Sequence, residues 1–187
     1  MPKMLSLALL LLCLTVAVPA AAADKSPTPT PQDHVLGNAA APVTIIEYAS
    51  LTCPHCARFE KETYPLIKKD WLDPGKARYI YRDFPLDRYA LLASTIAQCA
   101  LRDRYFAFIQ SFFDSQESWV MAGDPLAALK GIARLGGMDA ASVDKCLADT
   151  KAQEAIVQTE AQAKDDYGVD STPTFFIIGA NGTVKLI

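Results

Sequence analysis

Apolar positions follow two different spacings along the chain, and the change between them separates the expected strands from the expected helices. The β-branched and apolar run from Val43 to Tyr48 is typical of a strand covered on both faces, so we expect it at the centre of a sheet. His34 to Gly37 predicts a short edge strand before it, joined through the turn-forming residues 38–42.

Helical spacing begins at Cys53 and continues to about Lys69. Its apolar side is expected to hold Phe59, Leu66 and Ile67, with the charged residues, Glu60 among them, elsewhere. Pro65 interrupts the hydrogen-bond ladder and predicts a kink near Glu62. An aromatic-rich strand from Ala77 to Phe84 follows, which gives a β-α-β unit with parallel strands.

About eighty residues then carry helical patterns before the next strand. The first helix is expected from Asp87 to Arg104, and an aromatic stripe continues from Tyr105 to Phe113 as core. Asp124 followed by Pro125 is an N-cap signal, and the last helix is expected to stop at Gly168. The chain closes with a hairpin of 175–178 and 183–187 turning at Asn181 and Gly182.

Two cysteines at the junction of the central strand and its helix are the main candidates for chemistry. Cys53 and Cys56, separated by Pro54 and His55, have the spacing of a redox pair. A thiol at a helix N-terminus faces unpaired backbone N–H groups and the positive end of the helix dipole, which stabilise its thiolate. His55 adds a hydrogen bond or a positive charge, so Cys53 is the expected nucleophile and Cys56 the resolving thiol.

Three other interpretations of this motif fit the sequence less well. A haem attachment site needs histidine directly after the second cysteine, where Ala57 stands. A structural zinc site needs four ligands, and no second Cys or His pair lies nearby, so we expect no metal. A plain structural disulfide remains open, although the strand and helix on either side favour a redox-active one.

Composition and charge indicate in which cellular compartment the protein acts and which kinds of partner it can bind. Residues 1–23 have the three parts of a secretory signal peptide, and residues 24–33 form a proline-rich stretch expected to be a solvated linker. The 18 basic and 21 acidic residues leave a formal net charge of −3 with no basic cluster, which indicates no nucleic-acid partner. We expect an exported protein of the periplasm or another extracytoplasmic space.

The motif Cys-Pro-His-Cys at 53–56, with the acidic Glu47 six positions before it in a strand, resembles the DsbA family of exported thiol oxidoreductases. The resemblance extends from about Val35 to Val184. It implies an α/β thioredoxin-like fold, formed by residues 34–86 and 169–187, with an inserted α-helical subdomain at 87–168. That fold would continue after the hairpin with a final helix, so we expect the sequence, which stops at Ile187, to be truncated, or a partner or second copy to cover that face.

The resemblance also implies roles for residues outside the motif. Glu47 would pass protons to and from the buried cysteine, although a structural carboxylate stays open. Pro173 would be a cis-proline facing the dithiol, and the backbone of Thr172 would pair with a bound peptide. The expected function is to introduce disulfides into reduced or unfolded polypeptides, with reoxidation by a membrane redox partner. The protein would act as a monomer without any cofactor other than its own disulfide.

Cys99 and Cys146 are the remaining cysteines once Cys13 leaves with the signal peptide. Each lies on the apolar side of its own expected helix in the insertion, which favours a structural disulfide between them. Two buried free thiols are the alternative, because cysteine is a common core residue.

Two alternative functions use the same site. The first is a disulfide reductase or isomerase, because Thr172 resembles the threonine of related isomerases rather than the valine of the best-known oxidases. The second is a non-catalytic chaperone or a thiol-based metal carrier. Copper carriage would call for further Met or His ligands near the dithiol, and residues 50–60 offer only His55.

Overall fold

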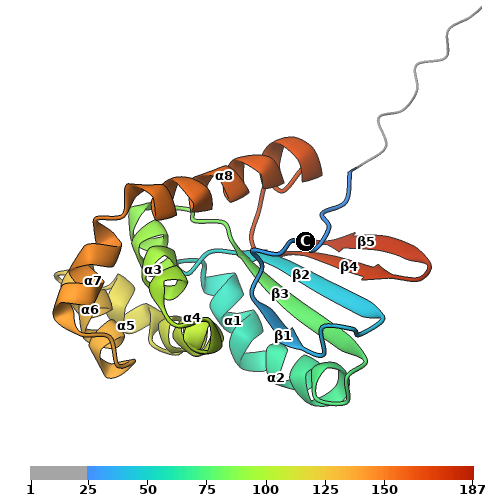
Figure 1. Cartoon of the computed structure of the whole chain (residues 1–187), viewed down its shortest axis with the longest axis horizontal. Helices are drawn as coiled ribbons and strands as arrows, with labels where there is room; N and C mark the ends of the chain where they lie inside the picture. The colour runs from blue at the N-terminus through green and yellow to red at the C-terminus, as the bar shows by residue number, and fades with distance from the viewer. Residues whose placement is uncertain (1–24) are drawn as a thin grey trace, which may run out of the picture.

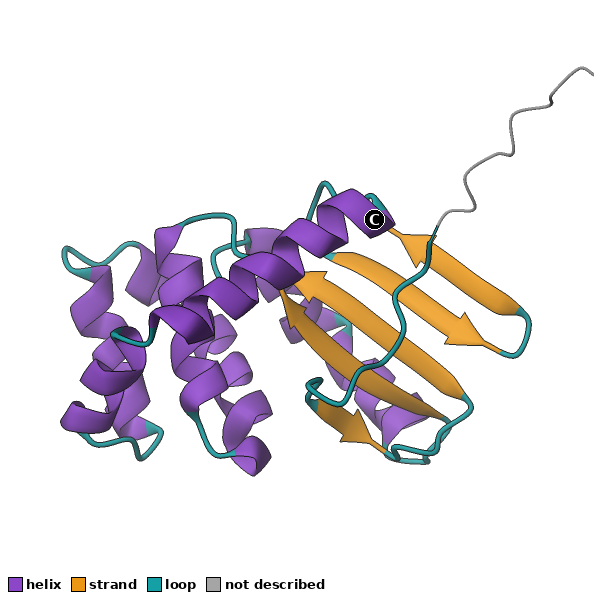
Figure 2. Ribbon diagram, turned by 45° about the horizontal axis from the view of Figure 1, so that its top comes forward, coloured by secondary structure: helices purple, strands orange, loops and turns teal. Residues whose placement is uncertain are grey.

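The computed structural model describes residues 25–187, which fold around one mixed sheet flanked by helices (Figures 1 and 2). The signal peptide predicted at 1–23 lies outside the described residues. The sheet has five strands in the order β1-β3-β2-β4-β5. These are β1 Val35–Gly37, β2 Val43–Ala49, β3 Ala77–Asp83, β4 Thr174–Gly179 and β5 Gly182–Leu186.

Strand β2 is central, as its apolar run predicts. It is parallel to β3 and antiparallel to β4, so that Ile46 is opposite Ile80 on one side and Phe176 on the other. Because successive side chains alternate between faces, Ile45 joins one core and Ile46 the other. Glu47 lies two positions after Ile45, so its side chain points to the same face of the sheet as Ile45, the face against which the first helix packs.

The helices divide into those that follow β2 and those of the insertion between β3 and β4. Most of the insertion gathers at one end of the sheet in Figure 1, while its last helix runs back across the sheet and packs against it. The first group is α1 Pro54–Glu62, α2 Tyr64–Ile67 and a π-helical turn Lys68–Leu72. The insertion comprises α3 Arg88–Cys99, a 3₁₀ turn Arg102–Arg104, α4 Tyr105–Asp114, α5 Gln116–Val120, α6 Pro125–Leu135, α7 Ala140–Leu147 and α8 Thr150–Tyr167.

Helix ends in the insertion follow the local signals in the sequence. The Asp124 carboxylate accepts the Ala127 N–H at the start of α6, and Gly168 takes φ 59° where α8 ends. The aromatic stripe of α4 is core, as predicted. Its Tyr105, Phe108, Phe112 and Phe113 are buried, and Phe106 packs against them half-buried.

The helix expected over 53–69 breaks at Thr63, next to the kink predicted near Glu62, and α2 begins after it with Pro65 in its first turn. The expected apolar side is wrong for two residues: Leu66, expected on that side, is 59% exposed, and Glu60, expected elsewhere, is 8% exposed. Position 60 faces the core because it lies four residues after Cys56, on the same side of α1.

The helix expected over 87–104 also ends early. Its hydrogen-bond ladder stops at Cys99, because Ala100 takes an extended conformation with ψ 157°. Residues Arg102–Arg104 form a separate 3₁₀ turn before α4 begins. This break reverses the chain, which allows α4 to pack back against α3.

The stretch 24–33, expected to be a solvated linker, is mostly exposed from Lys25 on, but contacts near its middle and its end tie it to the sheet. Pro27 is buried, and the Arg82 guanidinium donates to the Thr28 carbonyl at 2.7 Å and to both oxygens of Asp33 at 2.9 and 2.8 Å. Arg82 and Asp33 are 7% and 8% exposed, so this ion pair is shielded from water. A buried cation on β3 therefore holds a segment whose own composition gives no reason to pack.

The terminal hairpin turns one residue earlier than predicted. Gly179 pairs with Gly182, so the two loop residues are Ala180 and Asn181. Gly182 has φ 111° at the first position of β5, and no residue other than glycine has positive φ in the described chain. The Asn181–Gly182 pair therefore does not form the predicted type of turn, in which both residues need positive φ.

Candidate functional site

Cys53 is the N-cap of α1 and follows a short loop after the central strand. Its backbone N–H donates to the Ser50 carbonyl at 3.0 Å, and the Ser50 hydroxyl accepts the Leu86 N–H at 3.2 Å. Ser50 is 1% exposed, so this hydroxyl ties the loop to the start of the insertion. The sequence motif is thereby held where strand, helix and insertion meet.

The surroundings of Cys53 favour its thiolate. The Cys56 thiol donates to the Cys53 sulfur, the Thr172 side chain adds a hydrogen bond, and the backbone N–H groups of Cys56 and His55 donate as well. Together they lower the pKa of Cys53 to about 5, against the opposing effect of burial. The Thr172 hydroxyl oxygen is buried and has no hydrogen-bond partner among residues 25–187, which leaves it available to this sulfur.

Cys56 is in the opposite situation. It is fully buried, and burial followed by its hydrogen bond to Cys53 raises its pKa above the usual value. Both cysteines are free thiols in this structure. The pair is therefore asymmetric: Cys53 ionises readily, and Cys56 keeps its proton.

The two residues between the cysteines are exposed. Pro54 occupies the first helical position of α1. An N–H at that position has no partner within the helix, so proline, which lacks one, costs no hydrogen bond there. The His55 side chain is also exposed, and its backbone N–H is the part that donates to Cys53. A stabilising role of the His55 imidazole stays a prediction.

The Thr172–Pro173 peptide bond is cis and lies against the dithiol. The Cys53 thiol donates to the Thr172 carbonyl oxygen at 3.3 Å. A cavity of about 540 Å³ opens beside it, lined by His55 and Pro173 together with apolar side chains such as Phe59 and Phe175. The structure thus brings together two segments 119 residues apart that the sequence analysis linked only through a resemblance.

Glu47 lies beneath the dithiol with no exposed surface. The Tyr79 hydroxyl donates to its Oε2, while Oε1 has no hydrogen-bond partner among the described residues. Burial, and then the nearby Glu60 charge, raise the pKa of Glu47 well above its usual value. The raised pKa favours the protonated form of the Glu47 carboxyl, and its charge, when present, would raise the pKa of Cys56.

Glu60 is a site residue that the sequence analysis missed. It lies one helical turn after Cys56, and its Oε1 is 3.5 Å from the Tyr79 hydroxyl. Burial raises the pKa of Glu60 to about 7. The spacing of four residues from Cys56 was the signal that could have placed this carboxyl on the buried side of α1.

Glu47→Gln is expected to stabilise the reduced protein more as pH rises. The folded-state pKa of Glu47 is raised, so its ionisation destabilises the fold progressively from about pH 4.5 up to that raised pKa. Each tenfold increase in the proton affinity of the folded state over the unfolded state corresponds to roughly 1.4 kcal/mol. The amide cannot ionise, so the variant escapes this loss. Urea unfolding at about pH 5 and about pH 8 measures the difference.

Glu62→Gln, which removes an exposed carboxylate at the end of α1, is the control, and its effect on stability is expected to be small, as is usual for a surface substitution. A Glu47→Gln effect that does not grow between the two pH values would contradict a raised Glu47 pKa.

Two further contacts join the motif to the insertion, and no pattern in the sequence predicted either of them. The Gln116 amide of α5 donates to the carbonyls of Leu51 and Cys53 at 2.9 and 3.0 Å. The Thr52 hydroxyl donates to Asp87, the N-cap of α3, at 2.6 Å. Both depend on residues distant in the chain.

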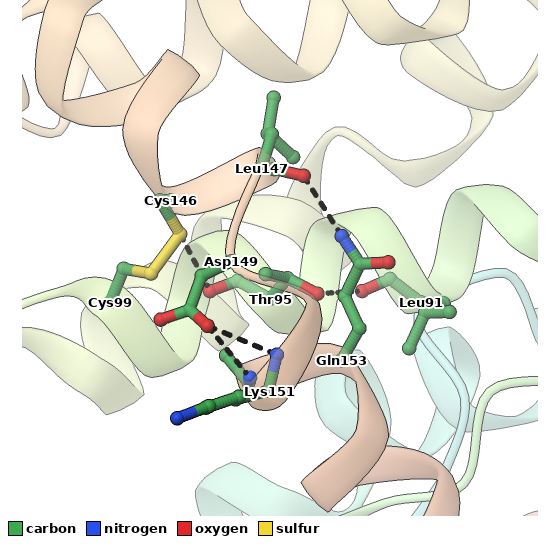
Figure 3. Close-up of a disulfide and its surroundings, with 9 residues drawn as sticks. Leu91, Thr95, Cys99, Cys146, Leu147, Asp149, Lys151 and Gln153 are labelled. Atoms are coloured by element: carbon green, nitrogen blue, oxygen red, sulfur yellow. Dashed lines mark hydrogen bonds between the residues drawn. A yellow bond between two sulfur atoms is a disulfide. The ribbon is translucent and has the colours of Figure 1, made fainter.

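Cys99 and Cys146 are joined in a disulfide that links α3 to α7 (Figure 3). The Cys146 sulfur lies 3.1 Å from the Thr95 carbonyl oxygen, and the Gln153 amide donates to the Leu147 carbonyl at 2.9 Å nearby. This disulfide belongs to the insertion and is separate from the Cys53–Cys56 pair. It joins the exposed end of α3, at Cys99, to the buried side of α7, at Cys146, which is the place of a structural bridge.

Residues 25–187 contain no cluster of three or more His, Cys, Asp or Glu side chains arranged to hold a metal ion. Within the same range, no helix combines the length and apolar character needed to span a membrane.

Comparisons with known proteins agree with this architecture. The model of a thioredoxin family matches residues 29–184. The crystal structure of alpha-DsbA1 from Wolbachia pipientis is 38% identical, with a TM-score of 0.76 over 80% of this chain and 76% of that one. A protein-disulfide isomerase from Novosphingobium aromaticivorans is 28% identical, with a TM-score of 0.71 over 83% of this chain and 89% of that one.

Among curated proteins, one from Rickettsia bellii, whose name proposes a protein-disulfide oxidoreductase, is 30% identical over 148 residues. The match covers 79% of this chain and 57% of that protein, so the chain spans little more than half the length of this relative.

A mixed sheet with a helical insertion and a Cys-x-x-Cys pair at the N-terminus of α1 defines a thioredoxin-fold protein with a dithiol site, and the chain belongs to the thioredoxin family. Within that family it is DsbA-like, as the resemblance of its motif predicts.

Proposed function

We propose that the protein is an exported thiol–disulfide oxidoreductase that introduces disulfides into substrate polypeptides through Cys53 and Cys56. The observation that carries this proposal is the asymmetry of the pair. Hydrogen bonds hold the pKa of Cys53 at about 5, whereas Cys56 is buried with a raised pKa. A thiolate that is stable when reduced makes its disulfide a strong oxidant, and DsbA is itself the standard example of this logic.

The reaction begins with an oxidised Cys53–Cys56 disulfide. A substrate thiolate attacks the Cys53 sulfur, which forms a mixed disulfide and releases Cys56 as a thiolate that takes up a proton. A second substrate thiolate then attacks the substrate sulfur of the mixed disulfide, which releases Cys53 as a thiolate. Two electrons pass from the substrate dithiol to the pair, and Cys53 leaves readily because its thiolate is stabilised.

The proton for Cys56 can come from Glu47. Its carboxyl is buried beneath the dithiol, and its raised pKa favours the protonated form that can give up a proton. When the pair is reoxidised, the same carboxylate can take the proton back as Cys56 resolves a mixed disulfide on Cys53. Glu47 would therefore act in both directions of the exchange.

Substrate polypeptides would bind along Thr172 and Pro173. The Thr172 carbonyl lies next to the Cys53 sulfur, and a backbone group there can pair with an extended peptide in strand fashion. The apolar cavity beside Pro173 has room for a side chain of that peptide. An unfolded chain offers both an accessible backbone and apolar side chains.

The cellular setting follows from the sequence. A signal peptide at 1–23 would deliver the protein to the periplasm or a comparable space, where a membrane redox partner would reoxidise the pair. The active unit would be a monomer of a thioredoxin-like domain, 34–86 and 169–187, with the insertion at 87–168. The redox-active disulfide would serve in place of a bound cofactor.

The test is the equilibrium of the Cys53–Cys56 pair with glutathione, together with the oxidation of a reduced, unfolded polypeptide. An oxidase is expected to equilibrate at a potential well above that of thioredoxin, about −270 mV, and to place disulfides in the polypeptide. Equilibration near the thioredoxin value, with no oxidation of the polypeptide, would replace this proposal with the reductase alternative.

A further inference from the structure

Gln116 reaches from the helical insertion to the backbone around the nucleophile. It is the first residue of α5 and is 9% exposed. Its Nε2 lies 2.9 Å from the Leu51 carbonyl oxygen and 3.0 Å from the Cys53 carbonyl oxygen. Since an amide nitrogen carries two hydrogens, one side chain can satisfy both carbonyls at once.

The two carbonyls lie on either side of the junction between the loop and α1. That of Leu51 belongs to the loop entering the motif, and that of Cys53 also accepts the Ala57 N–H at 3.2 Å, the first hydrogen bond of α1. Holding both oxygens fixes the loop relative to the helix end. The orientation of the backbone N–H groups that donate to the Cys53 sulfur depends on that same helix end.

The hydrogen bonds from Gln116 are expected to stabilise the Cys53 thiolate electrostatically. A carbonyl oxygen is the negative end of a dipole, and two of them beside Cys53 oppose a negative charge on its sulfur. Donors on those oxygens offset part of their partial charge, which favours the thiolate. The amide does not ionise, so this effect is present at every pH at which the protein is folded.

We propose that Gln116 is a positioning residue for the Cys53–Cys56 pair, through which the helical insertion holds the carbonyls on both sides of the nucleophile and so sets how strongly the pair oxidises. This inference rests on the proposed function, because it assumes that Cys53 reacts as a thiolate. It gives the insertion a part in the chemistry of the site, beyond covering one face of the sheet.

Gln116→Met tests this directly, because methionine keeps the unbranched length of the side chain and removes both donors. The midpoint of the thiolate absorbance titration is expected to rise by about half to one pH unit. The equilibrium constant with glutathione should shift roughly 3- to 10-fold toward a weaker oxidant. Gln116→Glu, which brings a negative charge to the same carbonyls, should shift both readouts in the same direction and further.

Gln153→Met is the matched control. Gln153 also lies in the insertion and donates its amide to a backbone carbonyl, that of Leu147, next to the Cys99–Cys146 bridge and not to the motif (Figure 3). Its replacement also removes a side-chain hydrogen bond, but should leave both thiol readouts at wild-type values.

A Gln116→Met protein with a wild-type titration midpoint and a wild-type glutathione constant would overturn the inference, even if it were less stable, because Gln116 would then be merely structural. If Gln116→Met does not fold, Gln116→Leu, which also removes both donors without adding a charge, carries the same test. Failure of the proposed function is distinguishable, since it would appear in the wild-type protein as a Cys53 that does not ionise at low pH.

Discussion

Replacing Cys53 with serine is expected to abolish thiol–disulfide exchange, whereas replacing Cys56 with serine should leave a protein that forms mixed disulfides and cannot resolve them. In Cys53→Ser the remaining Cys56 thiol is buried and its pKa is raised, so its thiolate fraction near neutral pH is small. Its reaction with a small disulfide should be slower by about a hundredfold or more.

Mass spectrometry after mixing with glutathione disulfide measures the outcome. Cys56→Ser should carry one glutathione on Cys53 that persists, and Cys53→Ser should carry none over the same time. The assignment of nucleophile and resolving thiol would be reversed if the stable adduct formed on Cys56 in the Cys53→Ser protein.

Replacing both Cys99 and Cys146 with alanine is expected to lower the free energy of unfolding by about 4 kcal/mol. The bridge closes a loop between residues 47 apart, and the chain-entropy model gives about 4 kcal/mol for a loop of this length. Such a loss is a large part of the stability of an ordinary domain. The measurement is the urea unfolding of the variant and the wild type with the Cys53–Cys56 pair reduced in both.

A pair of serine substitutions at the same two positions serves as a second form of the test, because it keeps side chains of similar size. A loss well below about 1 kcal/mol in both forms would mean that the bridge does not constrain the unfolded chain.

Local signals account for much of what the sequence predicts correctly. The run from Val43 to Tyr48 is apolar enough to identify the central strand, and the spacing of Cys53 and Cys56 at its end identifies the candidate site. Asp124 and Gly168 begin and end helices through contacts within a few residues. In each case the physical cause lies inside the segment that shows the pattern.

Two of the misses have a different cause, which is dependence on distant residues. Gln116 acquires its role from carbonyls 63 and 65 residues away, and Pro27 is buried because Arg82 anchors the neighbouring backbone. No window of helical or strand length contains these contacts. Glu60 is a different case, because its spacing of four residues from Cys56 is a local signal that the sequence analysis did not use.

The pairing of the dithiol with Thr172 shows how the two kinds of information combine. The sequence alone offers only a threonine and a proline before a strand, and the resemblance to DsbA proteins suggested that they face the thiols. The structure places the Thr172 carbonyl 3.3 Å from the Cys53 sulfur and leaves the Thr172 hydroxyl free to engage the same atom. The residue before the proline can therefore act on the nucleophile as well as on a bound peptide.

The central claim is that Cys53 is a stabilised thiolate, and a pH titration of thiolate absorbance in the reduced wild-type protein tests it most directly. Cys53→Ser supplies the baseline, because it lacks the titrating group. The account predicts a single transition with a midpoint near pH 5, the value to which its hydrogen bonds lower the pKa of Cys53. A midpoint close to the free-cysteine value of about 8.5 would contradict it.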